Sequence, residues 1–182
     1  MMLILNRDFR LPEDGFYQLA PLGEFPHEAA GIVQVIDREA CEAMAALFAA
    51  DAAKENFAGV LIDFDHFSLD VGQRSEAAGW ITNLEARPDG LFAKIRWSDV
   101  GQAAVEGGRY RFLSPVWAKA DCVELGGNRV RPVRLLNAAV TNDPNLKGML
   151  PLSNRGRQAE DLKAGPVDLS PTCRGSERTP DE

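Results

Sequence analysis

Apolar side chains recur at helical spacing in one long stretch of this chain. Asp37 carries the short acceptor side chain that caps a helix N-terminus, and it is followed on one helical face by Ala40, Met44, Leu47 and Phe48. The pattern therefore predicts a helix that begins after residue 37 and runs to about residue 54.

The other apolar runs are short and bounded by turn residues, which is typical of strands. We expect strands at residues 59–66, 80–86, 91–97, 110–118, 122–125 and 130–140, and short strands and loops in the first forty residues. The turn sequence Arg87-Pro88-Asp89-Gly90 predicts a hairpin, and Ser98 can cap a short helix that ends at Gly107-Gly108. The predicted fold is a β-rich α+β domain: a compact, barrel-like antiparallel sheet with a few packed helices.

Polarity divides the chain into two parts. All 14 aromatic residues lie at or before Trp117, and from Ser153 onward the chain is polar. Such a segment cannot bury enough apolar surface to offset the entropy lost on ordering. We therefore expect one folded domain over residues 1–152 and a disordered tail or linker remnant over 153–182.

Charge and cysteine content narrow the function classes. A net charge of −7 argues against general binding to nucleic acid or to an anionic membrane, and the apolar runs fall short of the roughly 20 residues of a membrane span. Cys41, Cys122 and Cys173 are odd in number and lack metal-ligand spacing, so we expect free thiols. No cofactor or metal is expected.

His66 and Ser114 are the candidate chemical groups. His66 is one of two histidines and closes the apolar run 59–66, and Ser114 interrupts the run 110–118 just before Pro115. A serine hydroxyl needs a base within hydrogen-bond reach, and imidazole is the usual one. Pro115 removes a backbone donor, so we expect the strand to end or bulge at Ser114. Alternatively, His66 is a surface residue paired with a neighbouring aspartate, and Ser114 is a buried hydroxyl bonded to a carbonyl.

Two further polar groups interrupt apolar runs. Asp63, Asp65 and His66 could be metal ligands, but strand alternation would place the two aspartates on one face and the histidine on the other, which disfavours a site made by this run alone. Asn137 lies within an apolar run, where its carbonyl could orient an imidazole N–H or simply be a satisfied buried amide.

Five short segments, taken in order, resemble the Mu-like phage I proteins, a family of prohead (capsid maturation) proteases distantly similar to the herpesvirus assemblins. The matching segments cover about residues 15–150 and read Asp63-Phe64-Asp65-His66, Ala77-Ala78-Gly79-Trp80-Ile81, Asp89-Gly90-Leu91-Phe92-Ala93, Tyr110-Arg111-Phe112-Leu113-Ser114-Pro115 and Ala138-Ala139-Val140-Thr141-Asn142-Asp143-Pro144.

The resemblance implies a serine endopeptidase with His66 as the base and Ser114 as the nucleophile. Asn137 falls where many prohead proteases have a glutamate as the third residue, and a neutral amide stabilises imidazolium less than a carboxylate does. Asp65, Glu85 or Asp143 could serve instead. Backbone N–H groups at residues 107–109 are our candidate oxyanion hole.

The resemblance also implies partners and a location. The expected peptide substrates are the scaffold protein, the major capsid protein and the chain itself, inside the procapsid in the host bacterial cytoplasm, and assemblin-like enzymes suggest a homo-oligomer. The main alternative from another class is a non-catalytic capsid-assembly or scaffold-binding module on the same fold. A metal hydrolase built around Asp63 and His66 is a third.

Overall fold

A computed structural model describes residues 11–153, which form ten strands, two α-helices and three short 3₁₀ helices. The helices are α1 (Arg38–Ala52), α2 (Asp99–Glu106), η1 (Glu28–Ala30), η2 (Phe67–Leu69) and η3 (Lys119–Asp121). The strands are β1 (Phe16–Pro21), β2 (Gly23–His27), β3 (Ile32–Ile36), β4 (Val60–Phe64), β5 (Gly79–Arg87), β6 (Gly90–Trp97), β7 (Phe112–Val116), β8 (Cys122–Gly126), β9 (Arg129–Pro132) and β10 (Asn137–Thr141). The tail predicted for 153–182 lies outside the described residues, apart from Ser153, as do residues 1–10 of the predicted domain.

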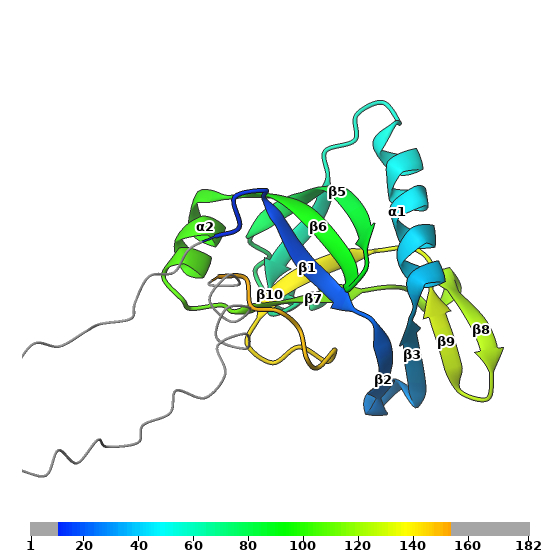
Figure 1. The fold of residues 1–182 in the computed structure, drawn as a ribbon. Helices are drawn as coiled ribbons and strands as arrows, with labels where there is room; N and C mark the ends of the chain where they lie inside the picture. Colours follow the sequence, from blue (N-terminus) through cyan, green and yellow to red (C-terminus); the bar gives the residue numbers. More distant parts are fainter. Residues whose placement is uncertain (1–10, 154–182) are drawn as a thin grey trace, which may run out of the picture.

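The strands form two sheets, a barrel and a smaller sheet beside it (Figure 1). Six strands in the order β1-β6-β5-β4-β10-β7 curl until the outer strands β1 and β7 contact each other, so this sheet is a nearly closed barrel. Four strands in the order β2-β3-β9-β8 form the second sheet. The prediction of a β-rich, barrel-like α+β fold is confirmed. The sheets are mixed rather than antiparallel, because β4 pairs with β10 and β3 with β9 in parallel.

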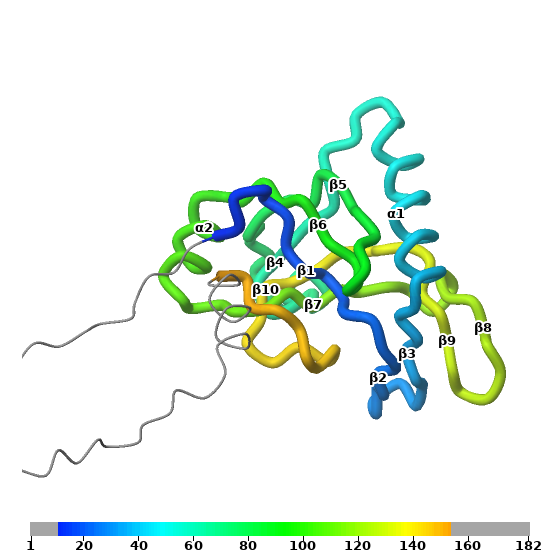
Figure 2. Tube along the Cα trace, in the orientation of Figure 1, coloured from blue at the N-terminus to red at the C-terminus, as the bar shows by residue number. Residues whose placement is uncertain are grey.

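The two sheets are connected near the start of the domain. A single residue, Leu22, separates β1 in the barrel from β2 in the second sheet, and the tube in Figure 2 shows the chain passing from one to the other. The hydrophobic core lies inside the barrel and under α1, which packs on β5, β6 and β3. Fully buried members of that core include Leu19, Met44, Ile81, Leu91 and Leu113.

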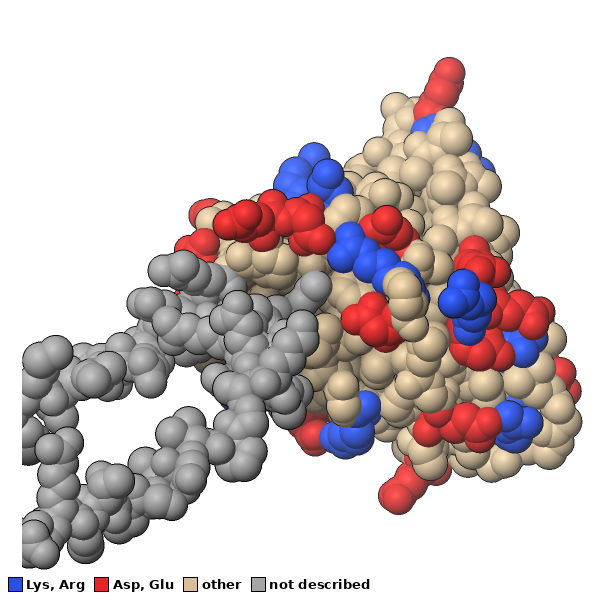
Figure 3. Space-filling model, viewed as in Figure 1, with Lys and Arg blue, Asp and Glu red and all other residues tan. Residues whose placement is uncertain are grey.

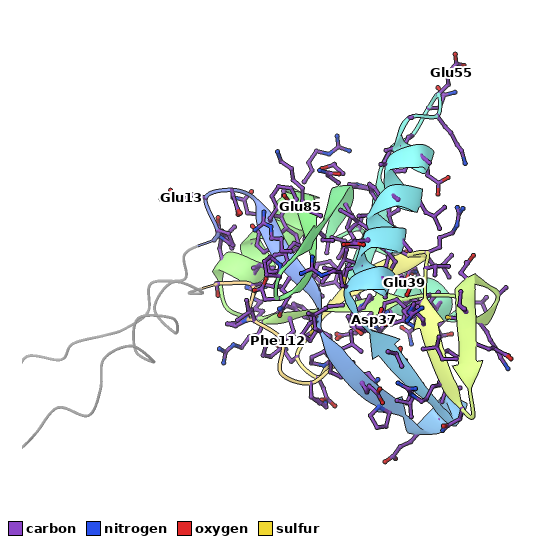
Figure 4. All side chains as sticks on the ribbon, turned by 45° about the vertical axis from the view of Figure 1, so that its right-hand side comes forward. Glu13, Asp37, Glu39, Glu55, Glu85 and Phe112 are labelled. Carbon is purple, nitrogen blue, oxygen red and sulfur yellow. The ribbon has the colours of Figure 1, made fainter. Side chains whose placement is uncertain are left out.

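Helix α1 begins where the sequence predicts. The Asp37 side chain accepts a hydrogen bond from the backbone N–H of Ala40 at 2.8 Å, which satisfies one of the free donors of the first turn. Arg131 on β9 donates to the other Asp37 oxygen at 2.7 Å and reaches Glu39 at 2.9 Å. Asp37 and Glu39 lie together at the base of α1 in Figure 4. The ion pairs therefore fix the start of the helix to the second sheet.

The predicted hairpin and the second helix are also confirmed. Strands β5 and β6 pair around the turn at Arg87–Gly90, and the Ser98 hydroxyl accepts from the N–H of Gly101 at 3.0 Å at the start of α2. The same hydroxyl donates to the carbonyl oxygen of Ala77 at 2.7 Å. A Cβ on Gly101 would lie 1.8 Å from the Ala78 carbonyl oxygen, so glycine is what allows α2 to approach this segment.

The single strand predicted over residues 130–140 is wrong. The chain leaves the second sheet after Pro132 and enters the barrel at Asn137, so β9 and β10 belong to different sheets. Between them, the N–H of Val133 donates to Asp121 and the N–H of Leu136 donates to Val116. These bonds satisfy the backbone while it crosses between the sheets, and the crossing brings β10 beside β4 and β7.

Charges of both signs are intermixed on the surface. On the face shown in Figure 3, lysines and arginines lie next to aspartates and glutamates over α1 and the neighbouring strands. Examples are the ion pairs Arg131–Asp37, Arg129–Glu24 and Arg87–Glu85. None of the helices within residues 11–153 has the length and apolar character needed to cross a membrane.

Candidate functional site

Three neighbouring strands of the barrel carry a row of small and polar side chains. Ala139 on β10 is in register with Asp63 on β4 and with Ser114 on β7. Residues in register on neighbouring strands point to the same face of a sheet, so Asp63, Ala139 and Ser114 share one face. Their neighbours Ile62, Leu113 and Ala138 point the other way, into the core. The row thus lies on the face of the sheet opposite the barrel core.

The chain turns sharply after β4 and folds back over this row. Asp65 and His66 both have left-handed backbone conformations, with φ of 49° and 63°. The turn then enters η2, where the N–H of Ser68 donates to Asp63 Oδ2 at 2.8 Å. A non-glycine residue with positive φ is uncommon, and two in succession mark a locally strained turn.

The expected strand alternation through His66 is wrong, because the chain turns before it reaches this residue. Because β4 ends at Phe64, the alternation does not extend to His66, and the two aspartates do not act as a pair. Asp65 is exposed and accepts a hydrogen bond from the Tyr110 hydroxyl at 2.9 Å, whereas Asp63 is completely buried. The Tyr110 ring packs on Phe64, on the side of β4 away from Asp63.

A pocket of about 560 Å³ lies between the barrel and the second sheet, and both His66 and Ser114 line it. Its barrel side also includes Thr141 of β10 and Leu69 of η2, and its other side includes Gln34 of β3. The remaining lining residues come from β7, from the second sheet and from the turns and loops beside them. The apolar ones are Ala30, Ile32, Pro115, Val116, Trp117, Val130 and Leu146, and the polar ones are His27, Lys119, Cys122, Asp143 and Asn145. The structure therefore brings the two predicted residues to one cavity.

Ser114 sits in a regular strand. The pairing of β7 with β10 runs without a register shift through Ser114 and Pro115, so the predicted strand end or bulge at this position is wrong. Proline fits because β7 is an edge strand of the sheet, where a residue without an N–H leaves no ladder bond unmade. The Ser114 side of the strand faces the pocket, and the residue is 8% exposed.

Asn137 is near the site but not in the pocket wall. It is 8% exposed, and its Nδ2 donates to the Ser68 hydroxyl at 3.2 Å. Within the described residues, three of the four buried side-chain polar atoms without a hydrogen-bond partner belong to this region: Asp63 Oδ1, His66 Nδ1 and Asn137 Oδ1. Polar groups that are buried without a partner are uncommon, and their gathering here makes the region our candidate functional site.

The other candidates for the third residue have different surroundings. Asp143 lines the pocket and bonds to Lys147 at 2.6 Å. That ion pair lowers the pKa of the Asp143 carboxyl, chiefly through the hydrogen bond from the ammonium group. Glu85 is paired with Arg87 at 2.7 Å on β5, and Asp65 is bonded to Tyr110.

The second histidine also lines the pocket, which the sequence did not indicate. His27 ends β2, and its Nδ1 accepts a hydrogen bond from the N–H of Ala30 at 3.2 Å. Gln34 is likewise a pocket residue that pattern reasoning missed, and its Oε1 accepts from the Trp117 indole at 2.9 Å. Both residues lie on the second sheet, across the pocket from the barrel, and no local sequence signal reports that arrangement.

The cysteines of the described chain are poor candidates for a nucleophile. Burial raises the pKa of the Cys41 thiol to about 11, and the negative charges of Asp37 and Glu42 add to this effect. Cys122 lines the pocket, but burial and then the charge of Asp121 raise the pKa of its thiol. A raised pKa reduces the thiolate, which is the reactive form.

The oxyanion hole predicted at residues 107–109 is wrong. The N–H groups of Gly107, Gly108 and Arg109 donate to the carbonyl oxygens of residues 103, 105 and 104, where they close the end of α2. They are therefore committed to the helix terminus. Within residues 11–153, no group of three or more histidine, cysteine, aspartate and glutamate side chains is arranged to hold a metal ion.

The fold and the pocket define a class of protein: a β-rich α+β domain with a nearly closed barrel, in which a serine and a histidine share one cleft beside a second sheet. Comparison with family models then gives the particular family. Residues 17–153 match the N-terminal domain of the Mu-like prophage I proteins, and the chain belongs to that family. The resemblance inferred from the sequence segments is confirmed.

Two curated relatives were found. Protease I of Escherichia phage Mu is 29% identical over 167 residues, which cover 84% of this chain and 43% of that protein. The Mu-like prophage FluMu I protein of Haemophilus influenzae is 27% identical over 152 residues, which cover 75% of this chain and 39% of that protein. The chain thus spans less than half the length of these relatives. No solved structure matches it.

Proposed function

We propose that this domain is a serine endopeptidase that cleaves scaffold and capsid-associated proteins, and its own chain, during capsid maturation of a Mu-like phage or prophage. The observation that carries the proposal is that His66 and Ser114, which come from separate elements, line one cavity. Membership of the family supports it, as does the name of the phage Mu relative, Protease I.

The proposed chemistry is acyl transfer. His66 takes the proton of the Ser114 hydroxyl while the serine oxygen bonds to the scissile carbonyl carbon, and the carbonyl π electrons move to its oxygen. When that intermediate collapses, the C–N bond breaks and His66 gives its proton to the leaving amine. Water, deprotonated by His66, then hydrolyses the acyl-enzyme and restores both side chains.

The pocket suits an extended peptide with apolar side chains. Its walls are mostly apolar: Val130 and Ile32 lie on the second sheet, and Trp117 lies just after the strand that carries Ser114. A polypeptide lying between the two sheets would bury apolar side chains there and expose one carbonyl to the serine. The proposed substrates are the scaffold and major capsid proteins, within the procapsid in the bacterial cytoplasm.

Active-site labelling tests the proposal without a known cleavage sequence. The parent chain is treated with a fluorophosphonate probe and digested, and the labelled serine is located by mass spectrometry. We expect the label on Ser114, with labelling lost in Ser114→Ala and reduced at least about a hundredfold in His66→Gln. Ser75→Ala, at an exposed serine, is the matched control and should label like the parent.

Co-expression with scaffold and capsid proteins tests the substrates. We expect both partners to shorten with the parent chain and to stay intact with Ser114→Ala. If His27→Gln rather than His66→Gln silences the probe, the assignment of the base is wrong. If neither Ser114 nor any other serine is labelled and the partners stay intact, the chain is a non-catalytic assembly module on this fold.

A further inference from the structure

A buried carboxylate without a permanent cation lies beside the site. Asp63 is completely buried, its Oδ2 accepts from the N–H of Ser68, and its Oδ1 has no partner among the described residues. None of the ion pairs found within residues 11–153 includes it. Burying a charged group costs free energy unless the group is paired. An unpaired buried carboxylate therefore requires a hydrogen-bond donor or a cation beside it.

The histidine of the site is the group that fits this requirement. His66 follows Asp63 by three residues, and the turn between them brings η2 back over the carboxylate. Its Nδ1 is also buried and also lacks a hydrogen-bond partner among the described residues, so the bond proposed below between these two atoms is not formed in this structure. Two other acids near the turn are engaged elsewhere: Asp65 with Tyr110, and Asp143 with Lys147.

The register of the strands gives the order of the groups. Asp63 and Ser114 lie on either side of Ala139, and all three side chains share one face. Alanine projects only a methyl group, so the space between the carboxylate and the hydroxyl is open to a larger side chain from above. His66 is the residue that the back-folded turn delivers to this face, and it lines the same pocket as Ser114.

We propose that Asp63 is the positioning residue of the site: its carboxylate accepts the Nδ1–H of His66 and leaves Nε2 directed at Ser114. The inference rests on the proposed function for its catalytic meaning. With Nδ1 protonated, Nε2 is the free base that a serine nucleophile needs, and the imidazolium that forms in the reaction becomes the counter-charge of Asp63.

Ser68 and Asn137 complete this arrangement as its support. The backbone of Ser68 holds one Asp63 oxygen, and its hydroxyl is held by Asn137 Nδ2 at 3.2 Å. Asn137 therefore acts on the turn through Ser68, which leaves Asp63 Oδ1 as the acceptor that we assign to the imidazole.

Nitrogen NMR of the imidazoles tests the inference on the parent chain. The protein has two histidines, so His27→Gln assigns the His66 signals by elimination. At about pH 9, where a free imidazole is neutral, we expect His66 to carry its proton on Nδ1. A parent chain in which neutral His66 carries its proton on Nε2 overturns the proposal, whether or not Ser114 is a nucleophile.

Paired variants then test the consequence for reactivity. Asp63→Asn keeps an oxygen for the Ser68 N–H but removes the charge, and we expect fluorophosphonate labelling of Ser114 to fall at least about a hundredfold and the His66 tautomer to change. Asp65→Asn, two residues away, is the matched control and should alter neither. Thermal melts establish that both variants fold.

The outcomes separate this inference from the proposed function. Loss of labelling in Ser114→Ala together with normal labelling and an unchanged His66 tautomer in Asp63→Asn would overturn the positioning role and leave the protease proposal standing. A parent chain that is not labelled, but whose His66 carries its proton on Nδ1, would overturn the protease proposal and leave the positioning role standing. If Asn137→Ala changes the tautomer and Asp63→Asn does not, the amide is the orienting group.

Discussion

Ala139 is the smallest side chain in the row that crosses β4, β10 and β7, and its size matters at the residue scale. It is completely buried between Asp63 and Ser114. In the arrangement that we propose, any larger side chain here would occupy the space assigned to the His66 ring between the carboxylate and the hydroxyl. The position therefore requires a small side chain, and it does not require a particular functional group.

Substitution of Ala139 tests the requirement for a small side chain. We expect Ala139→Val to slow fluorophosphonate labelling of Ser114 at least about tenfold and to destabilise the fold by about 1–3 kcal/mol through overpacking. Ala139→Gly should cost about 1 kcal/mol, because glycine weakens a strand, yet keep the labelling rate within about threefold. Labelling and urea unfolding, measured side by side, separate the two effects; equal labelling in both variants would contradict the argument.

Cys41 offers a second test at this scale. Because burial and two neighbouring carboxylates raise the pKa of its thiol to about 11, we expect alkylation by iodoacetamide at pH 8 to be about a hundredfold slower than for a free thiol. The same protein unfolded in urea provides the control. Peptide mass spectrometry reads each cysteine separately, and fast native modification of Cys41 would show that the thiol is not buried.

The sequence pointed to pocket residues that have a local signal and missed those that have none. His66 and Ser114 stand out because each is polar in an apolar run, and the sequence motifs single out the same two residues. The direction of His66 relative to Asp63 was misread, because alternation assumes a strand that continues, and the left-handed turn at two non-glycine residues has no clear sequence mark. Gln34 joins the site only through packing between distant segments.

At the scale of elements, the start of α1 depends on one aspartate with two partners. Burial alone would raise the pKa of the Asp37 carboxyl, but hydrogen bonds from Arg131 and from the N–H of Ala40, together with the charge of Arg131, lower it below its ordinary value of 3.8. A carboxyl with a lowered folded pKa contributes stability above its ordinary value. That contribution is lost as the pH falls through the folded value, below about pH 4.

We therefore expect Asp37→Ala to lower the free energy of unfolding at pH 7 by about 0.5–2 kcal/mol, the usual range for a lost N-cap. Asp37→Asn keeps the cap and removes the charge, so it should cost less. The difference in free energy between the parent and either variant should shrink below pH 4, where the parent carboxyl is protonated. Urea unfolding from pH 7 to pH 3 measures this, and a gap that widens on acidification would contradict the assignment.

Helices and turns whose sequence signals act within a few residues were predicted correctly. The caps at Asp37 and Ser98 and the Arg87–Gly90 turn act within a few residues, and all three elements formed as expected. The run 130–140 failed because its apolar residues are buried in two different sheets, a fact that periodicity within the run does not carry. Which strands pair in parallel is equally a property of the whole topology.

At the scale of the whole molecule, one hydrogen bond joins the two walls of the pocket. Trp117, just after β7, donates to Gln34 on β3 at 2.9 Å, and both residues line the cavity. Trp97 makes a comparable bond to Tyr17 at 3.0 Å, but entirely within the barrel. The two tryptophan hydrogen bonds can therefore be compared directly: the Trp117 bond joins the two sheets, and the Trp97 bond lies within the barrel.

We expect Trp117→Phe and Trp97→Phe each to cost about 1–3 kcal/mol, because each leaves a buried acceptor without its donor. Only Trp117→Phe should change the labelling of Ser114, by about threefold or more, since only it loosens the pocket. Thermal melts and probe kinetics on both variants provide the comparison. Equal effects on labelling would mean that the second sheet does not shape the site.

The passage of the chain from β1 to β2 has a consequence for how such domains diversify. Asp63, His66 and Ser114 all belong to the barrel, whereas the facing wall comes largely from the second sheet. Changes to the second sheet can therefore alter which polypeptides fit without disturbing the groups that would cut them. Under the proposed function, the choice of substrate and the cleavage of the peptide bond would therefore depend on different sheets, and each could change without the other.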